Sequence, residues 1–140
     1  MNLKRCIFIV ALIFALAAET LAADFVVVVH AENALSSMTE QDIKQIFLGK
    51  KTTWSNDRTI DIIIQEDTDA HAGFTQDILG KTSQQFMIYW KKMLFTGKGL
   101  LPRSVKTDTE VKAFVASNPD AIGYLSPDAL DNTVKRLEVR

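Results

Sequence analysis

The stretch from Ile60 to Leu79 reads I-D-I-I-I-Q-E-D-T-D-A-H-A-G-F-T-Q-D-I-L and joins two secondary-structure patterns. Its first part, Ile60 to Ile64, is an apolar, β-branched run of the kind that forms a buried strand. Its last part places Ala70, Phe74 and Ile78 four residues apart, and this spacing brings them to one face of a helix. The stretch therefore predicts a strand, a short loop and a helix in succession.

The loop between this strand and this helix is rich in carboxylates. Either Thr68 or Asp69 is expected to cap the helix, because a short side-chain oxygen accepts a hydrogen bond from a free N–H group of the first turn. In α/β proteins a strand that leads through a short loop into a helix start is a common anion-binding arrangement. The candidate ligand-binding residues for a small anion are Asp67, Thr68, Asp69, Ala70 and His71.

Similar patterns on both sides predict further elements. Apolar runs predict strands at 25–29 and 121–125, and alternating apolar residues predict a last, edge strand at 134–139. Cap residues followed by helical spacing predict helices that begin after Thr39, Thr82 and Thr107. Strands mixed with helices indicate an α/β fold with three layers, a mixed sheet flanked by helices. The expected core includes Ile46, Phe47, Phe74, Phe114 and Ile122, and the helix after Thr82 is expected to present an apolar face of Phe86, Trp90, Met93 and Leu94.

The first 23 residues have the pattern of a secretory signal peptide. Lys4 and Arg5 precede an apolar run from Ile7 to Ala18, and small residues lead up to Asp24. This run is short for a membrane span, so cleavage and export are expected instead. The sequence predicts a signal peptide at 1–23 and a single domain at 24–140, periplasmic or secreted and without a membrane span. The one cysteine, Cys6, lies in the segment to be removed, so disulfide and thiol chemistry are not expected.

Charge is balanced overall but unevenly distributed. The net charge is −1, which argues against a general nucleic-acid binder. No acidic residue occurs between Ile78 and Thr107, although six basic residues do. This segment is expected to be either a solvated surface or a docking face for an acidic partner. The residues expected to contact such a partner are Lys91, Lys92, Lys98 and Arg103.

The sequence has no pattern typical of catalysis. It contains no nucleophile–base motif, no metal-binding motif and no glycine-rich nucleotide loop. We therefore expect neither enzymatic activity nor a cofactor.

Three segments carry a resemblance to a known family. Residues 46–50 (I-F-L-G-K), followed by Trp54, resemble the I-F-x-G-K…W element of the phosphate-binding proteins of ABC transporters. Residues 118–124 (N-P-D-A-I-G-Y) resemble the N-P-G-A-I-G-Y element of that family. Residues 95–99 (F-T-G-K-G) are similar to a segment of its short, single-lobe members. The resemblance covers nearly all of 25–139 and implies one lobe of a type 2 periplasmic-binding-protein fold.

The resemblance also implies where the ligand lies and how this chain differs. The S-G-T type turn of the family falls on Thr68, Asp69 and Ala70, and His71 stands where short members often have an arginine. Asp69 replaces a glycine, and the carboxylates of the loop would repel an anion by about 1 kcal/mol for each close pair, even in water. A protonated His71 would offset one charge. Phosphate binding is therefore expected to be weak and to strengthen from pH 8 to pH 6.

Several interpretations follow from these observations. The chain is a phosphate-binding-protein-like module with a weak anion site. Alternatively, it is a ligand-less interaction module, with a capped helix and a solvated acidic loop, that docks on a protein partner of the cell envelope. In a third interpretation two copies form a dimer that rebuilds a two-lobed cleft. A metal site is a further alternative, and its ligands would be His71, Asp67, Asp69 and His30.

Overall fold

The computed structural model describes residues 24–140, so the signal peptide expected over 1–23 lies outside the described residues. In the described part the strands are β1 (Val26–His30), β2 (Ser37–Met38), β3 (Asp61–Gln65), β4 (Arg103–Val105), β5 (Ala121–Leu125) and β6 (Val134–Val139). The helices there are α1 (Glu40–Phe47), α2 (Asp69–Asp77), α3 (Ser83–Phe95), α4 (Asp108–Ser117) and the short 3₁₀ helix η2 (Pro127–Ala129).

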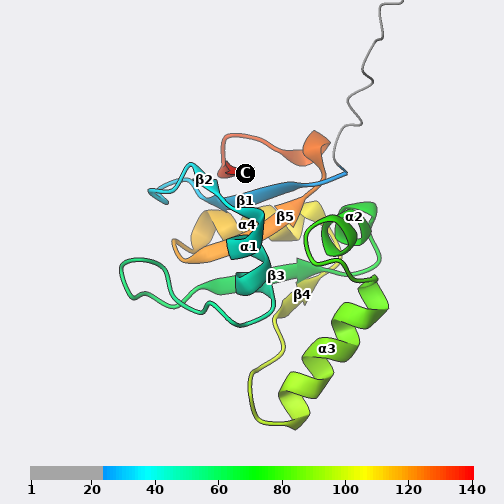
Figure 1. Cartoon of the computed structure of the whole chain (residues 1–140). Coiled ribbons are helices and arrows are strands. Elements are labelled where there is room, and N and C mark those ends of the chain that lie inside the picture. Colours follow the sequence, from blue (N-terminus) through cyan, green and yellow to red (C-terminus); the bar gives the residue numbers. More distant parts are fainter. Residues whose placement is uncertain (1–23) are drawn as a thin grey trace, which may run out of the picture.

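The strands form one mixed sheet in the order β2-β6-β1-β5-β3-β4, which confirms the expected α/β class (Figure 1). β3 runs parallel to β4 and β5, whereas β1 runs antiparallel to β5 and β6. The prediction of an edge strand at 134–139 is wrong, because β2 pairs with β6 through Ser37 and Met38. This pairing joins residues far apart in sequence, so the alternation within β6 carries no signal of it.

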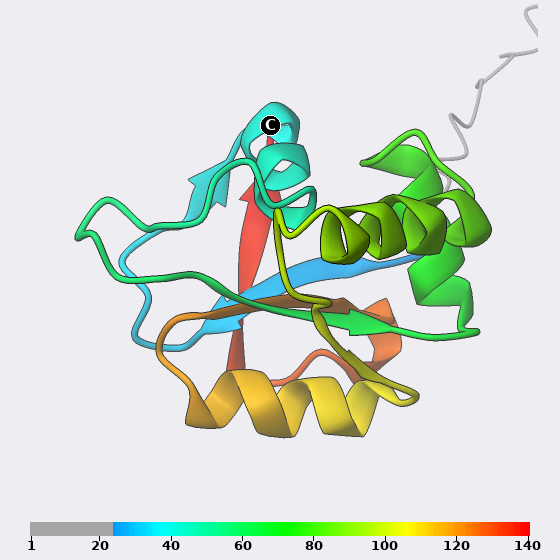
Figure 2. The ribbon, with the colours of Figure 1, turned by 90° about the horizontal axis from the view of Figure 1, so that it is seen from below.

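Helices cover both faces of the sheet, as Figure 2 shows. Helix α4 packs on one face, where Val111 and Val115 meet Val28 and Ile63. Helices α1, α2 and α3 lie on the opposite face, over a larger apolar cluster that includes Phe74. The three expected layers are therefore present, and burial of apolar surface on both faces holds them together.

Each α-helix begins directly after a threonine, as the cap patterns predict. The side-chain oxygens of Thr39, Thr68, Thr82 and Thr107 accept hydrogen bonds from the backbone N–H groups of Asp42, His71, Gln85 and Glu110. At Thr82 and Thr107 the third helical residue returns the bond and completes a capping box. Of the two cap candidates for α2, Thr68 is therefore the cap.

Most of the expected core residues are buried, but two apolar residues are not placed as predicted. Ile46, Phe47, Phe74 and Ile122 are fully buried. Phe114 is only half-buried, because α4 directs Val111 and Val115 at the sheet and Phe114 lies one position to the side. Leu94, on the predicted apolar face of α3, is 40% exposed, since only the side of α3 that carries Phe86 and Trp90 meets the core.

Within residues 24–140 no helix combines the length and the apolar character that crossing a membrane requires.

Candidate functional site

The predicted anion site lies where α2 begins, at the carboxyl end of β3. The neighbouring parallel strand β4 leads into α4 at the same edge, and β5 also ends there (Figure 1). Ligands of α/β sheets commonly bind at the carboxyl ends of parallel strands. The fold therefore brings the helix starts of α2 and α4 to one edge, which the sequence patterns did not predict.

The Thr68 hydroxyl is fully engaged within the protein as a donor. It accepts a hydrogen bond from the His71 N–H (3.1 Å) and donates its own proton to the side-chain oxygen of Gln65 (2.7 Å). A hydroxyl has one proton to donate. In this arrangement Thr68 therefore has no proton left for an anion.

Gln65 lies at the centre of a buried polar network that the sequence analysis missed. Its side-chain nitrogen donates to an Asp108 carboxylate oxygen (2.8 Å) and to the Tyr124 carbonyl oxygen (3.0 Å). The Gln65 backbone N–H donates to the Tyr124 hydroxyl (3.1 Å). The same Asp108 oxygen accepts the Ser126 N–H (3.1 Å). This network joins β3, β5 and both helix starts, and the only prior signal was a glutamine that ends an apolar strand.

His71 is buried, with 5% of its surface exposed. Burial lowers its pKa from the usual value, although the nearby carboxylates of Asp67 and Glu66 act in the opposite direction. The Tyr124 hydroxyl accepts a hydrogen bond from the Gln65 backbone N–H and lies 2.5 Å from Nδ1 of His71. In the tautomer with the histidine proton on Nε2, Nδ1 accepts a hydrogen bond from this hydroxyl. Burial also raises the pKa of Tyr124.

This environment bears on the expectation that His71 strengthens binding from pH 8 to pH 6. That expectation used the pKa of a free histidine. Burial lowers the pKa of His71, so this residue gains its proton at a lower pH than a free histidine does.

The carboxylates of the loop face solvent. Asp67 adopts a left-handed backbone conformation (φ 52°) and is exposed, as is Asp69 in the first turn of α2. Glu66 accepts a hydrogen bond from the Ser104 hydroxyl (2.7 Å). A hollow of about 360 Å³ beside α2 is lined by Asp24, Asp69 and Asp77 together with uncharged residues. These charges disfavour a bound anion.

Within the described residues, two backbone N–H donors at the start of α2 remain without an acceptor. The backbone N–H groups of Asp69 and Ala70 have no hydrogen-bond acceptor among residues 24–140. At the neighbouring start of α4 the Glu110 carboxylate accepts the N–H groups of Lys106 and Thr107. The N–H groups of Asp108 and Thr109, which correspond to those of Asp69 and Ala70, likewise have no acceptor among residues 24–140, so each of the two helix starts offers two N–H groups.

The metal interpretation is not supported by the structure. Among residues 24–140 no three side chains of the histidine, cysteine, aspartate or glutamate type come together as metal ligands. His30 ends β1, and its Nδ1 accepts a hydrogen bond from the Glu32 N–H (3.1 Å). His30 therefore does not join Asp67, Asp69 and His71 in one coordination shell.

Trp54 has a structural position, in line with its place in the quoted motif. Its indole nitrogen donates to the Asp120 carbonyl oxygen (3.1 Å), and the ring is buried. Arg58 forms a bidentate ion pair with the Asp120 carboxylate, with distances of 2.7 and 2.8 Å. These contacts fix the 50–58 turn against the residues that precede β5.

Comparison with solved structures shows which known fold the chain shares. A protein from Clostridium perfringens, assigned as a phosphate ABC transporter substrate-binding protein and solved with bound phosphate, aligns with a TM-score of 0.64 and 23% identity over 83% of this chain and 44% of its own. An ABC-type phosphate transport receptor from Vibrio cholerae aligns with a TM-score of 0.63 and 18% identity over 83% of this chain and 46% of its own. The chain spans less than half the length of either protein, and at these identities the likeness shows the fold.

No match was found among curated proteins. A family model described as the PBP superfamily domain matches residues 17–139, which is nearly the whole chain. This match confirms the resemblance inferred from the motifs at 46–54 and 118–124. The chain belongs to the family described as the PBP superfamily domain.

Proposed function

We propose that this chain is a non-enzymatic binding protein of the cell envelope that binds phosphate or a similar small anion weakly at Asp67–His71. The observation that carries the proposal is the pair of N–H groups of Asp69 and Ala70 at the start of α2, which lack acceptors within the described residues. A helix start favours an anion there by about 0.3–1 kcal/mol at an exposed site. The proteins that share the fold include one solved with bound phosphate.

The same site explains why binding is weak. The Thr68 hydroxyl already donates its hydrogen bond to Gln65, and burial lowers the pKa of His71, which disfavours its charged form. The exposed Asp67 and Asp69 each oppose a nearby anion by about 1 kcal/mol. Together the two carboxylates oppose the anion by about 2 kcal/mol, more than the helix start contributes, so we expect a dissociation constant on the order of 1 mM or weaker.

The experiment is a calorimetric titration with phosphate and with sulfate at pH 8 and pH 6. Removal of the Asp69 charge in Asp69→Gly and Asp69→Asn should strengthen binding about fivefold, because about 1 kcal/mol of repulsion is lost. Asp57→Asn, at an exposed position in the 50–58 turn, is the matched control and should change affinity less. Sulfate affinity should rise less from pH 8 to pH 6 than an unperturbed histidine would cause, since burial lowers the pKa of His71.

Two outcomes contradict the proposal. Tight binding by the unaltered protein that Asp69→Gly leaves unchanged or weakens means that the carboxylates serve the ligand. No binding by the protein or by either Asp69 variant means that α2 does not hold an anion.

A further inference from the structure

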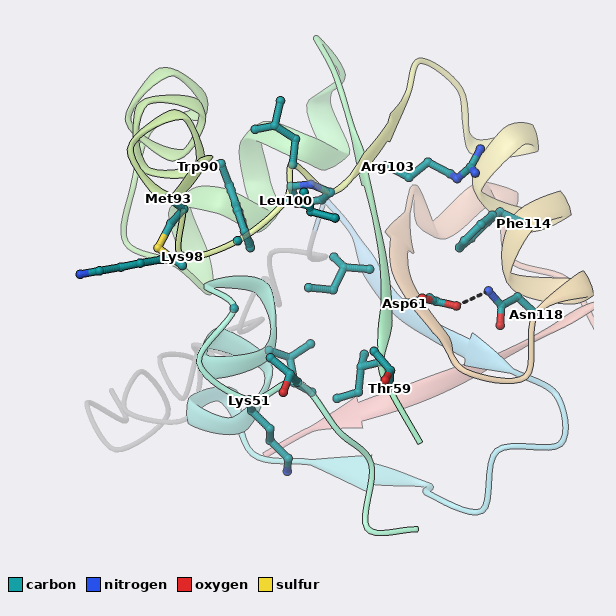
Figure 3. A pocket seen from close by; sticks show the side chains of 18 residues that line it. Lys51, Thr59, Asp61, Trp90, Met93, Lys98, Leu100, Arg103, Phe114 and Asn118 are labelled. Atoms are coloured by element: carbon teal, nitrogen blue, oxygen red, sulfur yellow. Dashed lines mark hydrogen bonds between the residues drawn. The ribbon is translucent and has the colours of Figure 1, made fainter. Parts of the chain in front are cut away.

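A second concave surface lies away from the start of α2. It is a groove of about 600 Å³ between α3, the segment 98–103 and the start of β3, and we call it the α3 groove (Figure 3). Its apolar lining includes Ile46, Ile62, Trp90, Met93, Leu100 and Phe114. A cavity of this size and lining is typical of a binding surface.

The wall of the α3 groove is well packed. Trp90 is buried, and its indole nitrogen donates to the Phe47 carbonyl oxygen (3.2 Å). A Cβ added to Gly49 would lie 2.9 Å from the Trp90 ring, and one added to Gly99 would lie 3.3 Å from it. The indole therefore packs closely against both backbones, and the groove is preformed rather than dependent on a ligand.

Large apolar side chains are exposed at and beside the groove. Leu100 is 83% exposed and Leu101 48% exposed, and both line it. Phe95, in the last turn of α3, is 85% exposed. Exposed apolar surface of this kind marks interaction sites. Phe95 lies outside the groove lining, so the large exposed apolar side chains of the groove itself are those of Leu100 and Leu101.

The charged side chains around the α3 groove are mostly cationic. Lys51, Lys98 and Arg103 line it, and none of them takes part in an ion pair among residues 24–140. Figure 3 shows Lys98 extending outward past Met93 and Arg103 lying beside Phe114, whose ring centroid is 5.0 Å from the guanidinium carbon. The one carboxylate of the lining, Asp61, already accepts a hydrogen bond from Asn118 (2.7 Å).

We propose that the α3 groove docks a segment of another protein in which carboxylates flank large apolar side chains. The apolar side chains would bury Leu100 and Leu101, and the carboxylates would meet Lys98, Arg103 and Lys51. Of the four cations expected from the sequence to contact a partner, Lys98 and Arg103 line the groove, whereas Lys91 and Lys92 lie outside it on α3. This inference is independent of the anion site at Asp67–His71.

Charge argues against the occupants that this chain itself offers. A symmetric pairing of two copies across the groove would place its lysines and arginine against their own equivalents. Residues 1–23 carry Lys4 and Arg5 against a single acidic residue, Glu19, so their charge has the same sign as the groove. A foreign acidic segment is the occupant whose charge complements Lys51, Lys98 and Arg103.

The test uses three labelled 15-residue peptides and measures fluorescence anisotropy with the purified protein at 0.15 M salt. The first peptide alternates glutamate with leucine and phenylalanine, the second has serine in place of the apolar residues, and the third has lysine in place of glutamate. We expect the first to bind at least about tenfold more tightly than the other two, because each lacks one of the two complementary features.

Surface variants show whether the groove is the site. Leu100→Ser and the double variant Lys98→Glu with Arg103→Glu should each weaken the first peptide about tenfold or more. Ile88→Ser and Lys91→Glu are matched controls on exposed α3 positions outside the lining, and they should change affinity less than about threefold.

Four results would overturn the inference. Equal binding of the acidic serine peptide and the acidic apolar peptide would show that only charge matters. Equal binding of all three peptides, or no binding by any of them, would show that the groove does not select such a segment. A dimer in sedimentation that Leu100→Ser separates would show that a second copy fills the groove. Displacement of the acidic peptide by a peptide of residues 1–23 would show that this segment fills it.

Discussion

At the scale of single residues, His71 shows how burial decides what a side chain contributes to the site. Its ring is buried and forms a hydrogen bond with the Tyr124 hydroxyl, and burial lowers its pKa. A cation at the same position could neutralise the carboxylates of Asp67 and Asp69. Because the His71 ring is buried instead, its charged form is disfavoured. The donors at the start of α2 are then backbone N–H groups.

The lowered pKa of His71 predicts a pH dependence of stability. Below about pH 6.5 the unfolded chain takes up a proton on this histidine, while the folded protein does not until its lower pKa is reached. The unfolded state then binds more protons, so the free energy of unfolding falls as pH falls, by at most about 1.4 kcal/mol per pH unit from this group. Urea unfolding at pH 7, 6 and 5 measures the effect.

The control for this prediction is His71→Asn, which has no titrating group at this position and should lose less stability on acidification than the unaltered protein. Ring-proton NMR of the unaltered protein provides a second measurement, with an expected midpoint for His71 below 6.5. A midpoint at or above 6.5, or equal pH slopes for both proteins, would contradict the account.

At the scale of helices and strands, local chemistry made the helix starts predictable. Thr39, Thr82 and Thr107 begin helices because a threonine cap and the residue three positions on interact within one turn. The short strands β2 and β4 and the interior position of β6 were not predicted, since they depend on partners distant in sequence. The Gln65 network was missed for the same reason, because Asp108 and Tyr124 come close only in the fold.

Helix α4 gives a test of burial that corrects the sequence-based expectation. Phe114 is half-buried and has Arg103 over its ring, whereas Phe74 is fully buried and stacks on Tyr124 at a centroid distance of 4.0 Å. Phe74→Ala should cost about 3–5 kcal/mol of unfolding free energy, and Phe114→Ala clearly less, because a half-buried ring leaves a smaller cavity. Denaturant melts of the two variants decide this, and equal losses would mean that Phe114 belongs to the core.

The capping box of α4 allows a second measurement on the same helix. Thr107→Ala removes the side-chain oxygen that accepts the Glu110 N–H (3.2 Å), and it should cost about 1 kcal/mol of unfolding free energy. Thr109→Ala, at an exposed position two residues further on, is the matched control and should be close to neutral. A similar cost for both variants would show that the cap is not what Thr107 contributes.

At the scale of the whole molecule, we propose that the chain acts outside the cytoplasm after removal of residues 1–23. The basic start and the apolar run from Ile7 to Ala18 motivate this proposal. Mass spectrometry of exported material should find a chain that begins near Asp24. An intact Met1 terminus in a membrane fraction would contradict it.

The fold and the family could be predicted from the motifs at 46–54 and 118–124, and the hydrogen-bond network around the candidate site could not. The quoted motifs are short runs whose residue types can be read directly. The hydrogen-bond donors that remain for a ligand depend on the bonds among Thr68, Gln65, Tyr124 and His71. Those bonds form only in the folded protein. A motif match alone therefore does not show which donors of this loop are already used within the protein.

The most direct test of a weak anion site at the start of α2 is amide-resolved NMR of the ¹⁵N-labelled protein during a phosphate titration at pH 7. We predict that the amide signals of Asp69 and Ala70 shift most and approach saturation with a midpoint on the order of 1 mM or weaker, because their N–H groups have no acceptor within the described residues. Saturable shifts centred instead on Lys98 and Arg103, or no saturable shift at Asp69 and Ala70, would contradict the account.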